Sequence, residues 1–313
     1  MTIHETTLGI DVSGGRLDAC LLPDGLARSF ANTPAGIHAL THWARERSAF
    51  IVLEATAPFD QALVRALETA GLAFHRANPR RARDFARSAG LLAKTDAVDA
   101  RMLALYGRAL DLRPTEPIDP ERLALQGLVA RRDQLVEMRK AERIRMKARP
   151  GPEAVQSLET VIAMLDEQIA AFDRLIDQAL ATPALKADHA VIRSAPGVGP
   201  VAAAVLLAHM PELGRIDRRA AASLAGLAPV ARDSGLMRGK RHVHGGRKRI
   251  RDALYMAALS ASRTGPLKPA YQKLIAAGKP PKLALIALAR KLLVAVNAAV
   301  RNRQTYAYQH VPS

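Results

Sequence analysis

The sequence contains one cysteine, Cys20, among its 313 residues. A lone cysteine excludes an intrachain disulfide and any zinc site built from paired cysteines. The first residues lack a basic segment followed by an apolar run, so we expect no secretory signal peptide. Internal repeats and low-complexity tracts are also missing. Together these absences favour a globular protein of the cytoplasm.

Apolar stretches long enough to span a membrane are scarce as well. The strongest candidate covers residues 283–300, but Arg290 and Lys291 lie at its centre, where charge is costly in a bilayer. We therefore expect a buried helix of a soluble domain and no membrane partner. Hydrophobic residues make up 49% of the chain, which excludes wholesale disorder.

Positive charge is abundant in this chain. Lys and Arg number 46 against 29 Asp and Glu, and the formal net charge is +17. Such a surplus favours a polyanionic partner, because Lys and Arg release counterions when they neutralise phosphates. A basic protein without a nucleic-acid role is the alternative that charge alone leaves open.

The first third of the chain alternates strand and helix patterns. Short β-type runs cover 6–12, 16–23, 26–32, 50–55 and 72–77, and helical patterns cover 34–47, 60–71 and 94–110, with a basic helix starting at Pro79. Three meandering strands followed by alternating helices and strands predict a ribonuclease-H-like α/β fold, with a mixed sheet between helices. We assign this domain to residues 1–112.

The composition changes to proline and acid around residues 112–120, which marks a linker. Two long charged helical patterns follow at 121–147 and 153–180. They predict an antiparallel helical hairpin or coiled coil within residues 113–182. We expect dimerisation through this hairpin, because it cannot bury both of its faces alone. The rest of the chain, 183–313, predicts a mainly α-helical domain.

Four acids occupy positions suited to a metal site. Asp11 ends the first strand and Glu54 ends the fourth, while Asp96 and Asp99 share one face of a helix. Carboxylates from two strand ends and one helix would bind Mg²⁺. Two such ions about 4 Å apart can catalyse phosphoryl transfer. Each acid alone also has an ordinary explanation, as a helix-start residue, a surface ion-pair partner or a strand end.

Two glycine-containing segments offer candidate nucleic-acid contacts. The turn "PGVGP" (196–200) precedes an apolar helix, and the N–H groups around Gly197 and Gly199 could cradle a phosphate as in a helix-hairpin-helix turn. Plain helix packing explains this turn equally well. Further along, glycines interrupt a basic stretch suited to phosphate contacts. Its candidate residues are Arg238, Lys240, Arg241, Arg247, Lys248, Arg249 and Arg251.

Ser234 comes just before this basic stretch, in the sequence "DSG". A serine hydroxyl is a weak nucleophile until a base, a metal or a lowered pKa activates it. The local chemistry therefore leaves two interpretations open: a solvated turn residue and a nucleophile that attacks a DNA phosphate.

The segments "GIDVS", "VLEATAPF", "KTDAVDARMLA", "PGVGPVAAAVLLA", "LAGLAPVARDSG" and "GGRKRIRDALYMAA" occur in this order along nearly the whole chain. They resemble the DEDD-type transposases of bacterial insertion sequences, a family that also includes pilin-gene invertases. The resemblance implies a RuvC-like N-terminal domain, a coiled-coil hairpin and a C-terminal transposase domain. It also implies that Asp11, Glu54, Asp96 and Asp99 bind Mg²⁺, and that Ser234 attacks DNA to form a covalent phosphoserine link.

The resemblance implies the partners of the protein too. Members of this family recombine element ends with target DNA under the direction of a structured non-coding guide RNA. They act as oligomers whose sites combine the metal domain of one subunit with the serine of another. We therefore expect a homodimer or homotetramer on nucleoid DNA in the bacterial cytoplasm. Two alternatives stay open: a RuvC-like junction endonuclease that uses water, and a non-enzymatic nucleic-acid-binding protein.

Overall fold

The chain forms two compact units, Met1–Pro117 and Ile118–Ser313. The computed structural model describes residues 4–91, 96–230, 233–234, 237–238 and 242–306, with the backbone alone at 96–97, 230, 233–234 and 237–238. The boundary between the units falls in the proline-containing segment that the sequence predicts as a linker.

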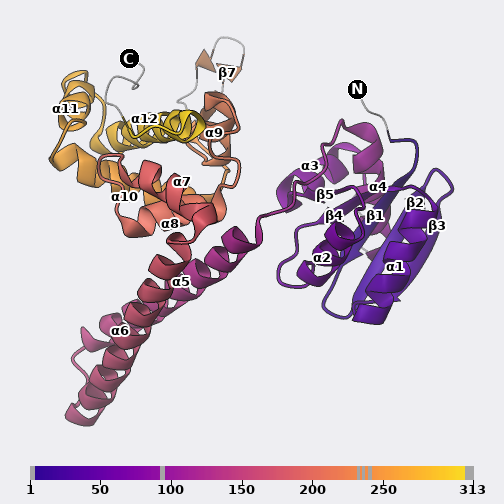
Figure 1. The fold of residues 1–313 in the computed structure, drawn as a ribbon, viewed down its shortest axis with the longest axis horizontal. Coiled ribbons are helices and arrows are strands. Elements are labelled where there is room, and N and C mark those ends of the chain that lie inside the picture. Colours follow the sequence, from indigo (N-terminus) through magenta and orange to yellow (C-terminus); the bar gives the residue numbers. More distant parts are fainter. Residues whose placement is uncertain (1–3, 92–95, 231–232, 235–236, 239–241, 307–313) are drawn as a thin grey trace. The chain divides into compact units, whose positions relative to one another are not determined.

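The N-terminal unit is built on a five-stranded sheet with the strand order β3-β2-β1-β4-β5 (Figure 1). The first three strands form an antiparallel meander, and β4 and β5 continue the sheet parallel to β1. The strands are β1 (Thr7–Val12), β2 (Arg16–Leu22), β3 (Leu26–Ala31), β4 (Phe50–Glu54) and β5 (Phe74–Ala77). This mixed sheet confirms the predicted α/β class.

Helices cover both faces of this sheet. They are α1 (Pro34–Glu46), α2 (Gln61–Thr69), α3 (Pro79–Ser88) and α4 (Asp96–Ala109). One hydrophobic cluster joins α1 and α2 to Leu8, Ile10 and Val12 of β1, and a second cluster joins α3 and α4 to the other face. Successive side chains of a strand point to opposite faces. The alternate residues of β1, Thr7, Gly9 and Asp11, therefore face α4.

Gly9 allows α4 to lie directly on β1. A Cβ atom at this position would be 2.0 Å from the carbonyl oxygen of Ala100 and 2.3 Å from the amide nitrogen of Ala104. The Thr7 hydroxyl donates a hydrogen bond of 3.1 Å to the Ala104 carbonyl. Because Thr7 contacts Ala104 and Gly9 contacts Ala100, the helix runs antiparallel to the strand. Its first turn therefore lies toward the carboxyl end of β1.

The substitution Gly9→Ala is expected to lower the free energy of unfolding by more than about 2 kcal/mol, because the added methyl group overlaps backbone atoms that cannot move independently. Gly15→Ala is the matched control, since a Cβ there meets no heavy atom within 4 Å. Equilibrium urea unfolding of the two variants and wild type measures the difference. A Gly9→Ala protein as stable as wild type would contradict this close packing of α4 on β1.

The C-terminal unit combines a long helical hairpin with a helical bundle (Figure 1). Its helices are α5 (Pro120–Met146), α6 (Pro152–Leu180), α7 (Pro183–Arg193), α8 (Pro200–His209), α9 (Arg218–Leu224), α10 (Lys248–Arg263), α11 (Lys268–Ala276) and α12 (Pro281–Asn302). The bundle confirms the predicted mainly helical C-terminal region. The division of the chain into three functional domains stays a prediction.

The hairpin helices α5 and α6 pack side by side along their length (Figure 1). Leu135 of α5 is buried against Leu165 and Ile169 of α6. Two ion pairs flank this apolar contact. Arg132 pairs with Asp173 at 2.5 Å, and Arg139 pairs with Asp166. These pairs hold the two helices in register, whereas a role of the hairpin in oligomerisation stays a prediction.

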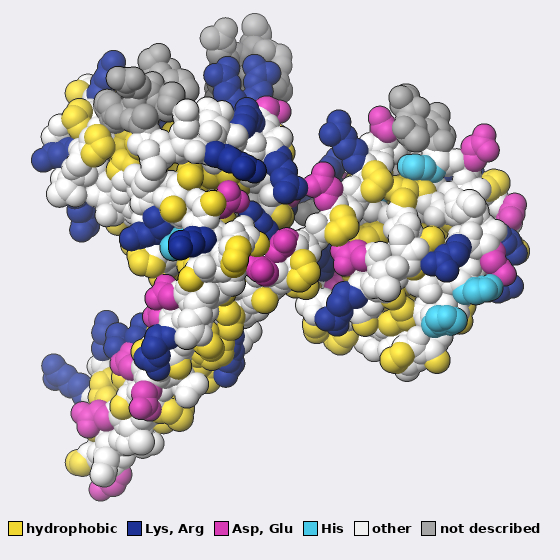
Figure 2. Space-filling view, viewed as in Figure 1, with side chains coloured by type: hydrophobic (Ala, Val, Ile, Leu, Met, Phe, Trp, Pro, Cys, Tyr) yellow, Lys and Arg dark blue, Asp and Glu magenta, His cyan; other side chains and the backbone are white. Residues whose placement is uncertain are grey.

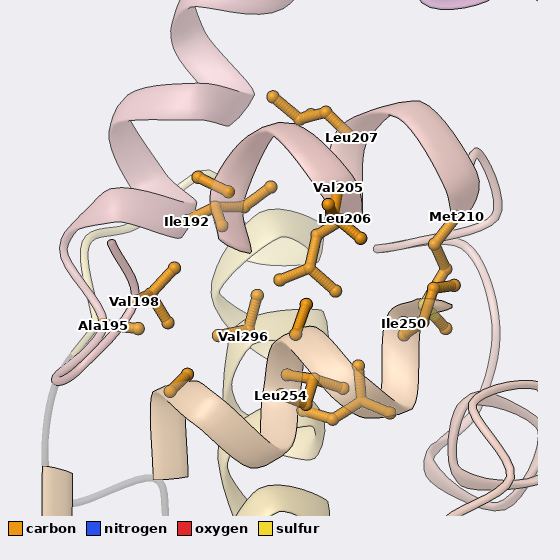
Figure 3. Packing of buried hydrophobic residues seen from close by; sticks show 14 of the residues in the cluster. Ile192, Ala195, Val198, Val205, Leu206, Leu207, Met210, Ile250, Leu254 and Val296 are labelled. Carbon is orange, nitrogen blue, oxygen red and sulfur yellow. The ribbon is translucent and has the colours of Figure 1, made fainter. Parts of the chain in front are cut away.

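The core of the bundle is formed where α7, α8, α10 and α12 meet (Figure 3). Leu206 of α8, Leu254 of α10 and Val296 of α12 are each at most 1% exposed. Within the described residues, α12 is the helix whose length and composition would suit a membrane span, and 56% of its apolar window is buried inside the protein. Its apolar residues therefore serve the bundle core, as the sequence predicts.

Four two-residue strands lie between α9 and α10 and were not predicted. They are β6 (Pro229–Val230), β7 (Asp233–Ser234), β8 (Met237–Arg238) and β9 (His242–Val243). β6 pairs with β9 and β7 with β8, both antiparallel. Strands this short have no alternating apolar pattern of their own, so the sequence shows only a polar, glycine-containing loop.

Candidate active site

Asp11 and Glu54 lie at the carboxyl ends of neighbouring parallel strands, on the same face of the sheet. Gly9 pairs with Val52 and Ile10 with Leu53, so Asp11 and Glu54 are the next residues along β1 and β4. Glu54 follows Val52 by two residues, and Val52 packs on the α4 side. Both carboxylates are partly exposed. Two predicted metal ligands therefore lie at one edge of the sheet, on adjacent strands about 4.8 Å apart.

Helix α4 brings Asp99 toward this edge. Asp99 precedes Ala100, whose carbonyl oxygen contacts Gly9, and it is partly exposed. Asp96 is the first residue of α4, and its side chain lies outside the described set. The first turn of α4 thus lies toward the carboxyl end of β1, as convergence of the four acids requires.

Asp18 is a further carboxylate at this edge that the sequence interpretation did not single out. It is the cross-strand neighbour of Asp11 in the β1–β2 pair, and directly opposed residues share a face of the sheet. Arg16 donates a hydrogen bond of 2.8 Å to its carboxylate. Pairing of the first two strands, which sequence spacing alone does not fix, brings this acid beside the site.

The described carboxylates are not gathered into a closed cluster. Within the described side chains, which exclude Asp96, no three Asp, Glu, His or Cys residues form a group that could hold one ion. By donor type and shared face, Asp11, Glu54 and Asp99 fit Mg²⁺, which prefers carboxylate oxygens.

A hollow of about 630 Å³ lies elsewhere, between α1 and α2. His38, Arg45 and Arg65 contribute to its lining. Because α1 and α2 pack on the face of the sheet opposite α4, this hollow is separate from the carboxylates.

Ser234 is the last residue of β7. It pairs with Met237 of β8, and Asp233 pairs with Arg238, so the two short strands are antiparallel. The structure thus places Ser234 at the end of a short paired strand. The predicted metal ligands belong to the N-terminal unit and the predicted nucleophile to the C-terminal unit. Their catalytic roles stay predictions.

The predicted phosphate-binding turn has a packing role at Gly197. Its φ is +76°, and a Cβ atom there would be 2.2 Å from the carbonyl oxygen of Ala257 in α10. Gly199 is the N-cap of α8, and a Cβ there would meet no heavy atom within 4 Å. Close approach to α10 therefore explains Gly197, while a phosphate contact by either glycine stays a prediction.

Several predicted nucleic-acid-binding residues make contacts within the protein. Arg247 donates hydrogen bonds of 2.7 and 2.6 Å to the Glu212 carboxylate, and Arg249 pairs with Asp133 of α5. Burial raises the pKa of Glu212, but the hydrogen bonds and positive charge of Arg247, together with a backbone hydrogen bond, outweigh it, so this pKa lies below its usual value. Both arginines thus stabilise the unit itself.

The other basic candidates differ in their surroundings. Lys248 pairs with Asp252 one turn along α10 and keeps 78% of its side chain exposed. Arg251 donates a hydrogen bond to the Gly245 carbonyl at 2.6 Å. Arg238 lies in β8 with its backbone alone described, and Lys240 and Arg241 lie outside the described residues. Lys and Arg side chains are also scattered over the visible face of the C-terminal unit (Figure 2).

Both units match known transposase families. Residues 8–149 match a transposase family model of the DEDD IS110 type. Residues 189–273 match the model described as "Transposase IS116/IS110/IS902 family". The first match covers the sheet with its carboxylates and α5, and the second runs from α7 to α11 and includes Ser234.

Curated relatives extend this similarity along the chain. The pilin gene-inverting protein of Moraxella bovis is 27% identical over 97% of this chain and 98% of its own length. An insertion element IS116 protein of Streptomyces clavuligerus is 38% identical over 45% of this chain and 36% of its own length. An insertion element IS900 protein of Mycobacterium paratuberculosis is 35% identical over 48% of this chain and 40% of its own length. The chain is thus a DNA transposase or recombinase, similar in both units to the insertion-sequence transposases of the IS116/IS110/IS902 family.

Proposed function

We propose that this transposase cuts and exchanges DNA strands through a covalent phosphoserine intermediate formed by Ser234. The observation that carries the proposal is the edge of the sheet where Asp11 and Glu54 lie at the carboxyl ends of adjacent strands, on the face covered by α4. Acids at such an edge suit phosphoryl transfer, and the matched transposase models cover both this edge and Ser234.

The proposed ligands of two Mg²⁺ ions are Asp11, Glu54, Asp96 and Asp99. When bound, these ions would supply positive charge that lowers the pKa of the attacking hydroxyl and offsets charge on the leaving oxygen. The chain itself contributes carboxylates from two strands and one helix, held in place by the packing of α4 on β1 through Gly9.

The number of phosphoester bonds stays the same in each chemical step. Ser234 Oγ loses its proton and bonds to the scissile phosphorus, while the bond from phosphorus to a deoxyribose oxygen breaks and that oxygen takes up a proton. After strand exchange, a deoxyribose hydroxyl attacks the phosphoserine, reseals the DNA and restores the serine. Because each step exchanges one phosphoester for another, ATP is not consumed.

We propose further that a structured non-coding guide RNA selects the DNA sites, and that the protein acts as a homodimer or homotetramer on nucleoid DNA in the cytoplasm. The net charge of +17 supports polyanionic partners of this kind. In this proposal the basic segment around α10, from Arg238 to Arg251, and the turn at Gly197 and Gly199 contact nucleic-acid phosphates.

A recombination assay in bacterial cells tests the proposed function. The protein is expressed with a donor plasmid that carries the element ends and flanking non-coding DNA, together with a target plasmid. We expect recombinant junctions, their loss when the flanking non-coding DNA is deleted, and their return when its transcript is supplied separately. Junctions that persist after the deletion would overturn the guide RNA, and no junctions with every component present would overturn recombination.

A further inference from the structure

Helix α3 presents a dense positive charge in only 10 residues. Its arginines, Arg80, Arg81, Arg83 and Arg87, are all exposed, and Asp84 is the one acid in the helix. Asp84 lies 4.0 Å from Arg80 and 3.8 Å from Arg87. All three side chains are at least 60% exposed, so these pairs contribute little energy. Among the described side chains, Arg81 and Arg83 have no acidic partner within ion-pair distance.

This helix begins at the edge of the sheet that carries the acids. Glu54 pairs with Ala77 of β5, and the Ala55 amide donates a hydrogen bond of 3.1 Å to the Ala77 carbonyl. Pro79, the first residue of α3, follows two residues later. The first turn of α3 is therefore one strand away from Glu54 and two strands away from Asp11.

The orientation of α3 is fixed by its apolar face. Ala82 is fully buried in the cluster between α3 and α4, and the ring of Phe85 lies 5.3 Å from the ring of Tyr106 in an edge-on arrangement. Tyr106 belongs to α4, the helix that also carries Asp96 and Asp99. Because one face of α3 is anchored on α4, its arginines lie on the outward side of a helix that starts at the edge of the sheet carrying Asp11 and Glu54.

The guanidinium groups, rather than the start of the helix, supply the binding chemistry. The Asn78 side chain already accepts hydrogen bonds from the amides of Arg80 and Arg81, so these two donors are occupied. Arginine offers planar paired donors that match the oxygens of a phosphate. Carboxylates at the edge of the sheet repel a phosphodiester, and arginines on a helix that starts at this edge offset that repulsion.

We propose that α3 binds the backbone of the DNA strand to be cut and guides it to the edge formed by Asp11 and Glu54. This surface adds a phosphate-binding element of the N-terminal unit to those predicted around α10. The inference rests on the proposed function for the position of the cut, but the binding of DNA phosphates by α3 does not depend on catalysis.

The salt dependence of DNA binding tests this surface without any chemistry. Full-length wild type and the double variant Arg81→Gln/Arg83→Gln are titrated in EDTA with duplex DNA that carries an element end. Each lost phosphate contact should reduce the slope of log K against log salt by about 0.9. We expect a decrease between about 1 and 2 for the double variant.

The matched control is Arg47→Gln/Arg65→Gln. It removes the same charge from the same unit, and both arginines are exposed near α1 and α2, away from α4. Its slope should equal that of wild type. A slope unchanged by the α3 substitutions, or reduced equally by both double variants, would overturn the inference. If the DNA is never cut, the slopes still decide whether α3 binds phosphates.

Photocrosslinking locates the bound strand. Arg83→Cys is labelled with a thiol-directed crosslinker, and wild type is the labelling control because its one cysteine, Cys20, is 4% exposed. We expect crosslinks to DNA within about five nucleotides of the element boundary, since nucleotides are spaced about 3.4 Å apart along one strand. Crosslinks that reach the guide RNA alone, or that are spread evenly along the duplex, would overturn the inference.

Discussion

Ser234→Ala protein is expected to form no covalent adduct with DNA. The substitution removes the oxygen that bonds to phosphorus but leaves a residue that a short strand accommodates. Loss of a nucleophile removes the whole covalent route, so strand exchange should fall at least about a thousandfold. The measurement is a denaturing gel of protein incubated with guide RNA, labelled element-end and target DNA, and Mg²⁺.

Ser223→Ala provides the control for this variant. Ser223 is an exposed residue of α9 in the same unit, and alanine suits a helix at least as well as serine. This variant should form the adduct at the wild-type rate. Metal-dependent cleavage that survives Ser234→Ala without any adduct would identify a nuclease that uses water, and the phosphoserine mechanism would be wrong.

The second large effect is expected from Asp11→Asn. Asparagine has nearly the same shape as aspartate but lacks the negative charge that a magnesium ligand at the end of β1 supplies. Adduct formation and strand cleavage should decrease at least a hundredfold, which corresponds to about 2.7 kcal/mol in activation free energy. The fold should persist, because Asp11 is partly exposed and the packing of α4 depends on Gly9.

Magnesium titrations separate this role from a general loss of activity. The rate of adduct formation is measured against Mg²⁺ concentration for wild type, Asp11→Asn and Asp24→Asn. Asp24 is an exposed residue in the turn between β2 and β3, at the opposite end of the strands from Asp11. The control should follow the wild-type curve. Asp11→Asn with an unchanged magnesium dependence and rate would remove Asp11 from the proposed metal site.

The sequence predicts the N-terminal fold well because its signals are local. Short apolar runs in β1 and β4, the Thr33 cap at the start of α1 and Pro79 at the start of α3 each mark an element within a few residues. The order of these elements then leaves few ways to arrange a mixed sheet. Asp11 and Glu54 could be placed together for the same reason, since ends of adjacent parallel strands share an edge.

Other features of the site depend on pairing between distant segments. The opposition of Asp11 and Asp18 follows from the register of β1 and β2, and Arg249 meets Asp133 only through the packing of α10 on the hairpin. The basic sequence around Arg249 therefore predicts a nucleic-acid contact, but it does not predict the ion pair with Asp133. The glycine inside β1 was a usable signal, because a glycine within a strand often marks close approach of another backbone.

The arginines of α3 also have a significance that the sequence alone does not predict. Their sequence, "PRRARDFARS", is plainly basic, yet a basic helix alone indicates no more than a solvated surface. Their importance follows from the pairing of Ala77 with Glu54, which places the helix beside the acids. The three-dimensional position, rather than the composition, distinguishes α3 from other basic segments of the chain.

Mapping the residue that carries the DNA tests the phosphoserine mechanism directly. After nuclease treatment of the trapped complex, trypsin releases the peptide "DSGLMR", Asp233–Arg238, in which Ser234 is the only hydroxyl-bearing residue. We predict that mass spectrometry finds a nucleotide remnant on this peptide and on Ser234. A remnant on any other peptide, or DNA cut in the presence of Mg²⁺ with no remnant on the protein, would contradict it.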